Sequence, residues 1–129
     1  MVKKLKIPDN YQTVMPYLIV KDAAKFIVFM QKVFDAGEAN KSMRDESIIM
    51  HGEIMIGGST IMFADSTEKF NVQTAGLFIY VDDADITFKK AIDAGATTLI
   101  EVADQTYGRS GGITDPFGNV WWITSMKNE

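Results

Sequence analysis

Apolar residues follow two different spacings along the chain, and the two spacings occur twice in the same order. An apolar run at residues 14–20 is typical of a strand. After it, apolar side chains recur at steps of three and four, as in a helix that packs one face on a sheet: Phe26, Phe29, Met30, Val33 and Phe34. The pattern predicts a strand over 14–20 and then a helix that starts after the N-cap Asp22 and stops at Gly37.

The second half of the chain repeats this order. A strand is expected over 76–81 and a helix over 84–94, with Asp82 and Asp83 at its N-terminus and Gly95 as its stop. Residues 32–37 and 90–95 share the pattern Lys-x-x-Asp-Ala-Gly. The two copies are offset by about 60 residues, and the small difference in offset between strand and helix end is close to one helical turn. The sequence therefore indicates an internal duplication.

Each predicted helix is followed by strands. In the first half they are expected at 46–50, 53–56 and 60–64, with a tight turn at Gly57 and Gly58. In the second half they are expected at 97–102, 112–114 and 120–124, with a turn over 115–119. Residues 1–129 are thus predicted to be one α+β domain of paired βαβββ modules, about 14–65 and 76–124. Because each helix covers only one face of its sheet, the two open faces can curl into a mixed sheet around a cavity.

Charge and composition narrow the classes of partner. The chain has a net charge of -4, with eight basic and eight acidic residues in 1–65 but five and nine in 66–129. Without a basic cluster we expect no nucleic-acid partner, whereas a cationic small ligand would be tolerated. Cysteine is absent, and no apolar run is long enough for a membrane span or a signal peptide. A soluble, cytoplasmic protein without membrane partners is expected.

His51 and Glu53 are the candidate catalytic residues. They are two positions apart on a predicted strand, so both side chains point to one face, while Met50, Gly52 and Ile54 point to the other. If the apolar set faces the helix, the imidazole and the carboxylate face the cavity and can act as a general acid/base couple. The alternative is a hydrogen-bonded strand histidine beside an exposed glutamate.

Strand alternation also predicts which side chains line the cavity. Such a pocket would be apolar and aromatic, with two phenols to orient a ligand and methionines that adapt to its shape. Alternatively, Trp121 and Trp122 are core and interface residues. The predicted lining residues are Met15, Tyr17, Thr60, Met62, Phe78, Tyr80, Val120 and Trp122.

Arg109 is a further candidate because it lies in a glycine-rich loop, where its guanidinium could hold a ligand carboxylate or phosphate. A structural bond to Asp115 or Asp104 is the alternative. Asp82, Asp83 and Asp85 crowd a predicted helix N-terminus, which favours negative charge; we interpret them as structural rather than as a cation site. Dinucleotide, phosphate-loop and serine-elbow motifs are absent from the sequence.

Four segments, in order, resemble the vicinal-oxygen-chelate superfamily, which includes glyoxalases, bleomycin-resistance proteins, fosfomycin-resistance enzymes and extradiol dioxygenases. They look most like its PhnB-type, glyoxalase/bleomycin resistance-like branch. The segments are Pro16-Tyr17-Leu18-Ile19-Val20-Lys21-Asp22-Ala23-Ala24, Met50-His51-Gly52-Glu53, Tyr107-Gly108-Arg109 and the turn that begins at Asp115. The resemblance covers about 14–124 and implies the glyoxalase/bleomycin resistance fold and usually a homodimer. It leaves open whether the modules pair within one chain or are swapped between chains.

The resemblance also implies where a metal centre would lie. Members with metal activity place a His or Glu on each of four strands, and these positions fall at Met15, near Met62, at Gly76 and at Trp122. None of these side chains suits a hard or borderline divalent ion. Asn119 also stands where many relatives have His. Independently, one histidine and no cysteine cannot build a common catalytic zinc site. No cofactor is expected, although a carboxylate-bound divalent metal is not excluded.

Two functions follow from these observations. The first is a glyoxalase/bleomycin-resistance-like protein that binds a small apolar, aromatic or cationic molecule in the sheet cavity without the usual divalent metal. The alternative is a lyase, isomerase or transferase of the same superfamily that uses His51 and Glu53 with an atypical metal or none. A third class, a structural dimer or regulator, would use the aromatic second half as an interface.

Overall fold

A computed structural model describes residues 5–126 and contains two βαβββ modules. The first consists of β1 (Tyr17–Val20), α1 (Ala23–Phe34), β2 (Gly37–Met43), β3 (Ile49–Ile56) and β4 (Ser59–Asp65). The second consists of β5 (Gly76–Tyr80), α2 (Ala84–Asp93), β6 (Thr97–Gln105), β7 (Gly108–Thr114) and β8 (Val120–Ser125). The predicted α+β class and the paired modules are confirmed.

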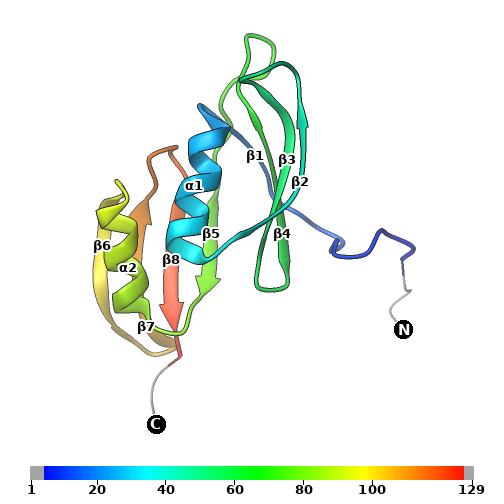
Figure 1. Cartoon of the computed structure of the whole chain (residues 1–129). Coiled ribbons are helices and arrows are strands. Elements are labelled where there is room, and N and C mark those ends of the chain that lie inside the picture. The colour runs from blue at the N-terminus through cyan, green and yellow to red at the C-terminus, as the bar shows by residue number, and fades with distance from the viewer. Residues whose placement is uncertain (1–4, 127–129) are drawn as a thin grey trace.

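The strands form two separate four-stranded sheets that are not closed into a barrel (Figure 1). The strand order is β1-β4-β3-β2 in the first sheet and β5-β8-β7-β6 in the second. In each sheet the first strand of the module pairs in parallel with the last, and the other pairs are antiparallel. The duplication seen in the sequence is therefore present in the topology as well.

The modules meet through α1. Its Phe26 ring packs 5.1 Å from Phe63 of β4, and its Phe34 ring packs 4.8 Å from Trp121 of β8. Phe117, in the turn before β8, packs edge-on against Phe26. Because Phe63 and Trp121 lie on the covered faces of their sheets, one core serves both modules, and each sheet turns its open face away from α1.

Both helices begin as the sequence predicts. Asp22 and Asp83 accept hydrogen bonds from the third residue of their helices, Lys25 and Ile86. The stop at Gly95 is confirmed, with a left-handed φ of 108°. The stop at Gly37 is wrong: Asp35 adopts the left-handed conformation after Phe34, and Gly37 begins β2.

Two strand predictions need correction. The strand β2 is not predicted, because every residue in it is exposed and no apolar alternation marks it. The segments 46–50 and 53–56 are not two strands, because 49–56 forms the single strand β3. At its start Ile49 is buried and Met50 is 49% exposed, so the expectation that Met50 faces the helix is wrong. The β2–β3 pairing is irregular beside this point, between Ser42 and Met43.

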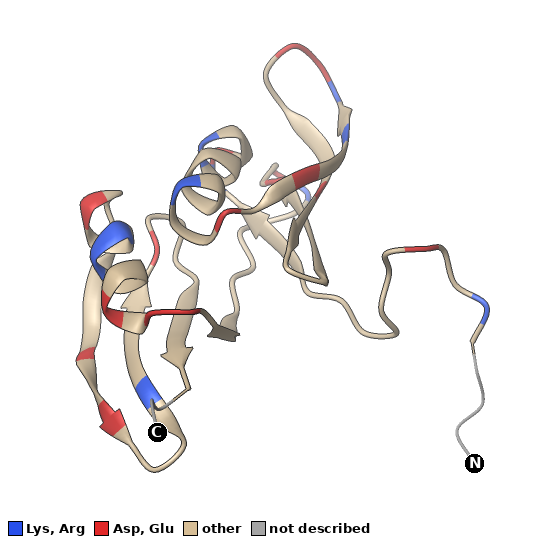
Figure 2. Ribbon diagram, turned by 60° about the horizontal axis from the view of Figure 1, so that its bottom comes forward, with Lys and Arg blue, Asp and Glu red and all other residues tan. Residues whose placement is uncertain are grey.

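Charged residues are spread over both modules rather than gathered on one element, as Figure 2 shows. None of the helices in the described part of the chain is both long and apolar enough to cross a bilayer.

Candidate functional site on the open face of the first sheet

A line of four hydrogen-bonded side chains lies on the open face of the first sheet. The Tyr17 hydroxyl lies 2.9 Å from Nδ1 of His51, and Nε2 of His51 lies 2.7 Å from Oε2 of Glu53. Tyr11 donates its hydroxyl to the same Glu53 oxygen at 2.6 Å. His51 thus stands between a phenol and a carboxylate, an arrangement that can fix the imidazole ring and pass a proton along it.

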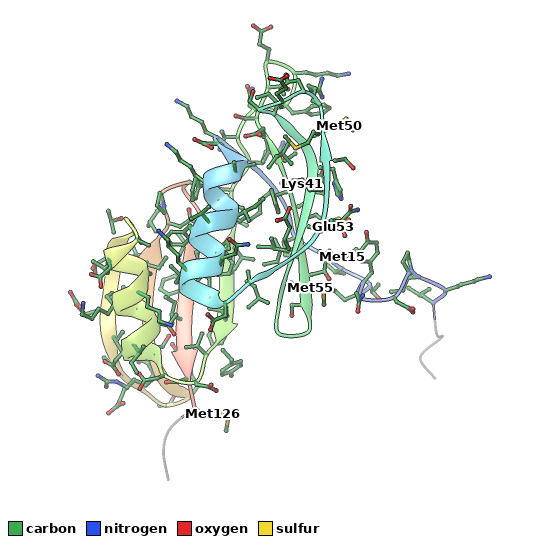
Figure 3. All side chains as sticks on the ribbon, in the orientation of Figure 1. Met15, Lys41, Met50, Glu53, Met55 and Met126 are labelled. Atoms are coloured by element: carbon green, nitrogen blue, oxygen red, sulfur yellow. The ribbon has the colours of Figure 1, made fainter. Side chains whose placement is uncertain are left out.

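Strand register explains why these residues meet. Tyr17 of β1 and Glu53 of β3 are both in register with Met62 of β4, which lies between them. His51 is two residues from Glu53, so the pair shares one face, while Ile54 is fully buried on the other. The prediction that His51 and Glu53 share the face opposite Ile54 is confirmed. Figure 3 shows Met15, Glu53 and Met55 at the first sheet, on the side away from the second module.

Glu53 is only 4% exposed, in contrast to the exposed glutamate of the alternative interpretation. Burial acts to raise the pKa of Glu53, but the hydrogen bonds from Tyr11 and His51 outweigh it, and the pKa lies below its ordinary value. The same contact raises the pKa of Tyr11, because the phenol donates to a carboxylate. Desolvation, followed by the charge of Glu53, raises the pKa of Tyr17. The site therefore holds a buried anion between neutral phenols.

Tyr11 is a residue of the site that the sequence does not predict. It precedes β1, outside any helix or strand, so no periodicity points to it. Its neighbour Gln12 binds the backbone of Thr60 through both amide atoms, donating to the carbonyl at 2.8 Å and accepting from the N–H at 3.3 Å. Thr60 in turn donates its hydroxyl to the Asn10 carbonyl. A Gln beside a Tyr before a strand carries no recognisable signal.

A hollow of about 260 Å³ adjoins the hydrogen-bonded line at Tyr17. Its wall is largely apolar, with one cationic side chain, Arg44, and one acidic side chain, Asp65, which suits a small organic ligand. Besides Tyr17, Ile19, Ala64 and Phe70 line it, with Arg44 and Met50. Arg44 and Phe70 come from loops and were not predicted.

The predicted lining residues of the second half lie on a different sheet. Strand register pairs Phe78 with Trp122 and Gly76 with Val120, and strand alternation puts these residues on the open face of that sheet. Phe78 packs against Tyr80 with ring centroids 5.2 Å apart. One chain therefore does not bring Met15 and Met62 together with Gly76 and Trp122. A groove of about 430 Å³ between the modules does bring Thr60 near Phe78 and Tyr80.

Arg109 lies away from both groups. Its guanidinium donates two hydrogen bonds to Asp85, at 2.6 and 3.0 Å, and one to Asp104 at 3.1 Å. These bonds raise the pKa of Arg109 and lower that of Asp85. The bond to Asp104 matches the structural alternative, whereas Asp115 makes its bonds elsewhere. Asp115 accepts from the Trp121 indole N–H at 2.9 Å and from the Asn119 side chain at 3.0 Å.

Comparison with known proteins assigns the family. The sequence profile of the Glyoxalase/Bleomycin resistance protein/Dioxygenase superfamily matches residues 11–123. The chain belongs to this superfamily. An uncharacterised protein of Mycobacterium bovis is 33% identical over 126 residues, covering 88% of this chain and 83% of that protein.

Two solved structures have the same fold. TioX from Micromonospora sp. ML1 aligns with a TM-score of 0.72 at 20% identity, over 92% of this chain and 98% of that one. A PhnB protein from Bacillus cereus, described as a putative 3-demethylubiquinone-9 3-methyltransferase, aligns with a TM-score of 0.69 at 19% identity, over 88% and 99%. At these identities the comparisons establish the fold.

The resemblance places the superfamily's metal ligands at four positions of this chain, and the side chains there do not fit a divalent metal. They are a thioether at Met15 and Met62, no side chain at Gly76 and an indole at Trp122, and none of these groups binds a divalent ion of the glyoxalase type. Within residues 5–126, the described part, no three His, Asp or Glu side chains gather in a way that could hold a metal. That the protein works without a metal stays a prediction.

Proposed function

We propose that this protein binds a small organic molecule on the open face of its first sheet, beside Tyr17, His51 and Glu53. The single observation that supports this most is the hydrogen-bonded line of side chains next to an apolar hollow. Few convergent polar groups on an apolar wall are the usual composition of a small-molecule site. The buried Glu53 anion favours a ligand that is partly apolar or aromatic and carries a cationic or hydrogen-bond-donating group.

We further propose that the binding cavity is completed in a homodimer. Each sheet has an open face, and that of the second sheet exposes aromatic side chains: Phe78 is 51%, Tyr80 64% and Tyr107 57% exposed. Exposed aromatic clusters of this kind favour an interface or a ligand surface. The aromatic face of a second copy would lie opposite the site on the first sheet. The predicted lining residues of the two sheets, which lie apart in one chain, would then line one cavity. The absence of cysteine supports a cytoplasmic location.

A thermal-shift screen tests ligand binding. Glycopeptide antibiotics, aromatic amines and aromatic metabolites are titrated against the wild-type protein and His51→Ala, with circular dichroism to check that the variant folds. We expect saturable stabilisation of the wild type, because a ligand that binds only the native state raises its stability by mass action. The stabilisation should be lost in folded His51→Ala. If no compound stabilises the wild type, or if both proteins respond equally, ligand binding at this site is contradicted.

A second candidate function is an enzyme that moves a proton through His51. The observation that favours it is that both ring nitrogens of His51 are engaged, one by Tyr17 and one by a carboxylate. Such a residue can act as a general acid or base. Elemental analysis of protein purified without a histidine tag separates the two candidate functions, since stoichiometric Mn²⁺, Ni²⁺ or Zn²⁺ bound near His51 would contradict a binding protein that works without a metal.

A further inference from the structure

Residues 8–12, which we call the N-terminal strap, are fastened to the first sheet by polar contacts. Pro8 and Tyr11 close a turn through a backbone hydrogen bond of 3.3 Å, and Asn10 adopts a left-handed conformation with φ 68°. The Gln12 side chain then binds both backbone groups of Thr60. This pairing imitates one rung of a β-ladder, so it fixes the strap in one register along β4.

The apolar side chains around the strap do not contribute to the core. Leu5 is 50%, Ile7 41% and Val14 81% exposed. Hydrophobic burial is therefore not what holds residues 8–12 in place. The contacts that do hold them lead to Thr60 and to Glu53, which points to a role at the site rather than in the fold.

The contact between Tyr11 and Glu53 involves the oxygen that His51 also contacts. Both the phenol, at 2.6 Å, and the imidazole, at 2.7 Å, approach Oε2 of Glu53. A buried carboxylate needs such donors, because an unpaired anion is costly to remove from water. Two donors on one oxygen share its electron density, so the strength of the His51 contact depends on whether Tyr11 is in place.

We propose that Tyr11 is a positioning residue of the site and that the strap closes over Glu53. The position of the strap, closed or open, then controls the strength of the contact between His51 and Glu53. With the strap closed, Tyr11 fixes the carboxylate and covers it from solvent. With the strap open, Glu53 loses one donor and becomes accessible to a donor or cationic group of a ligand. The proposal deepens the function proposed above by naming the residue that regulates its site.

Few side chains other than Tyr11 face His51 and Glu53. Tyr17 approaches His51 from β1, and Met62 of β4 lies between Tyr17 and Glu53. On β2, Ser42 is in register with His51 and Asn40 with Glu53. Among these neighbours only the two tyrosines are ionisable, and another ionisable group in contact with Glu53 is His51, which Tyr11→Phe and Tyr107→Phe both retain.

The experiment measures the titration of the Glu53 carboxyl carbon by ¹³C NMR in the free protein. The variants are Tyr11→Phe, which keeps the ring and removes the donor, and Tyr107→Phe, a matched change at an exposed tyrosine of the other module. We expect the pKa of Glu53 to move upward in Tyr11→Phe, because a donor to the charged form is lost, and to stay unchanged in Tyr107→Phe. An unchanged Glu53 titration in Tyr11→Phe would overturn the proposal.

A second variant tests the strap without altering the phenol. Gln12→Ala removes the two contacts to Thr60, and we expect a smaller upward move of the Glu53 pKa together with faster hydrogen exchange at the Thr60 amide. If Tyr11→Phe moves the titration but Gln12→Ala leaves both readouts unchanged, the strap is not what places Tyr11. Neither measurement uses a ligand, so a failed ligand screen and a failed strap remain distinguishable.

Discussion

The ring centroids of Trp121 and Phe34 lie 4.8 Å apart, and this contact joins the covered faces of the two modules. Phe34 ends α1 of the first module, and Trp121 belongs to the covered face of the second sheet. Because α1 packs on the first sheet and α2 on the second, and Phe34 of α1 reaches Trp121 on the covered face of the second sheet, the open faces point outward. The candidate site and the aromatic face of the second sheet are consequently on separate surfaces of one chain.

Phe34→Ala should therefore destabilise the whole chain rather than one module. We expect a loss of about 3–5 kcal/mol in the free energy of unfolding, since a buried aromatic ring is replaced by a cavity. Urea denaturation followed by tryptophan fluorescence and by far-UV circular dichroism measures the effect. Val28→Ala, at a half-exposed position of the same helix, is the control and should cost less than about 1 kcal/mol. Two separated unfolding transitions in the wild type would argue against a shared core.

Much of this arrangement could be predicted from the sequence, because burial leaves a periodic trace. The helices, their N-caps, the Gly57–Gly58 turn and β4 follow directly from apolar spacing and turn residues. β2 could not be found, since a strand that buries no residue has no alternation. The outward direction of the open faces could not be found either: strand alternation tells which residues share a face but not which module covers it.

Asp115 organises the turn that the sequence marks as a motif. It is 4% exposed and accepts four hydrogen bonds, from the backbone of Phe117 and Asn119 and from the side chains of Asn119 and Trp121. Asp115→Ala should cost about 3 kcal/mol or more, because it leaves buried donors without an acceptor. Thermal and urea unfolding measure the change.

Asp93→Ala is the control for this prediction. Asp93 pairs with Lys89 on the surface of α2 at 2.9 Å, and an exposed pair at this helical spacing contributes only about 0.3–0.5 kcal/mol. Equal effects of the two substitutions would mean that the turn does not depend on the Asp115 carboxylate.

Glu53 should make the free energy of unfolding depend on pH in the acid range. Its pKa is below the ordinary value of 4.5: burial acts to raise it, but the bonds from Tyr11 and His51 prevail. The folded state thus releases the proton more readily than the unfolded state. The resulting stabilisation is complete above about pH 4.5 and is lost as the pH falls through the lower pKa of the folded state.

Glu53→Gln keeps the shape of the side chain and removes the titration. We expect the difference in unfolding free energy between wild type and Glu53→Gln to change across this acid window. Urea unfolding at a series of pH values provides the measurement, with Asp93→Asn as a surface control. Parallel curves for wild type and Glu53→Gln down to pH 3 would contradict a lowered pKa in the folded protein.

The site was only half predictable for a physical reason. His51 and Glu53 were found because two residues on one strand share a face by geometry alone. Tyr11 reaches Glu53 across 42 positions from a segment without regular structure, and nothing local in the sequence encodes that contact. Arg44 and Phe70 are likewise brought to the hollow by loops.

The proposed dimer predicts that charge on the open face of the second sheet will separate the two copies. Tyr80→Glu places a carboxylate at a 64% exposed position beside Phe78, where burial against a second chain would require its desolvation. Sedimentation equilibrium should give twice the mass of one chain for the wild type and one chain for Tyr80→Glu. Ile86→Glu, at a 57% exposed position on α2, is the matched control and should stay dimeric. A monomeric wild type would rule out a cavity shared between chains, and dissociation by Ile86→Glu alone would place the interface on the helices instead.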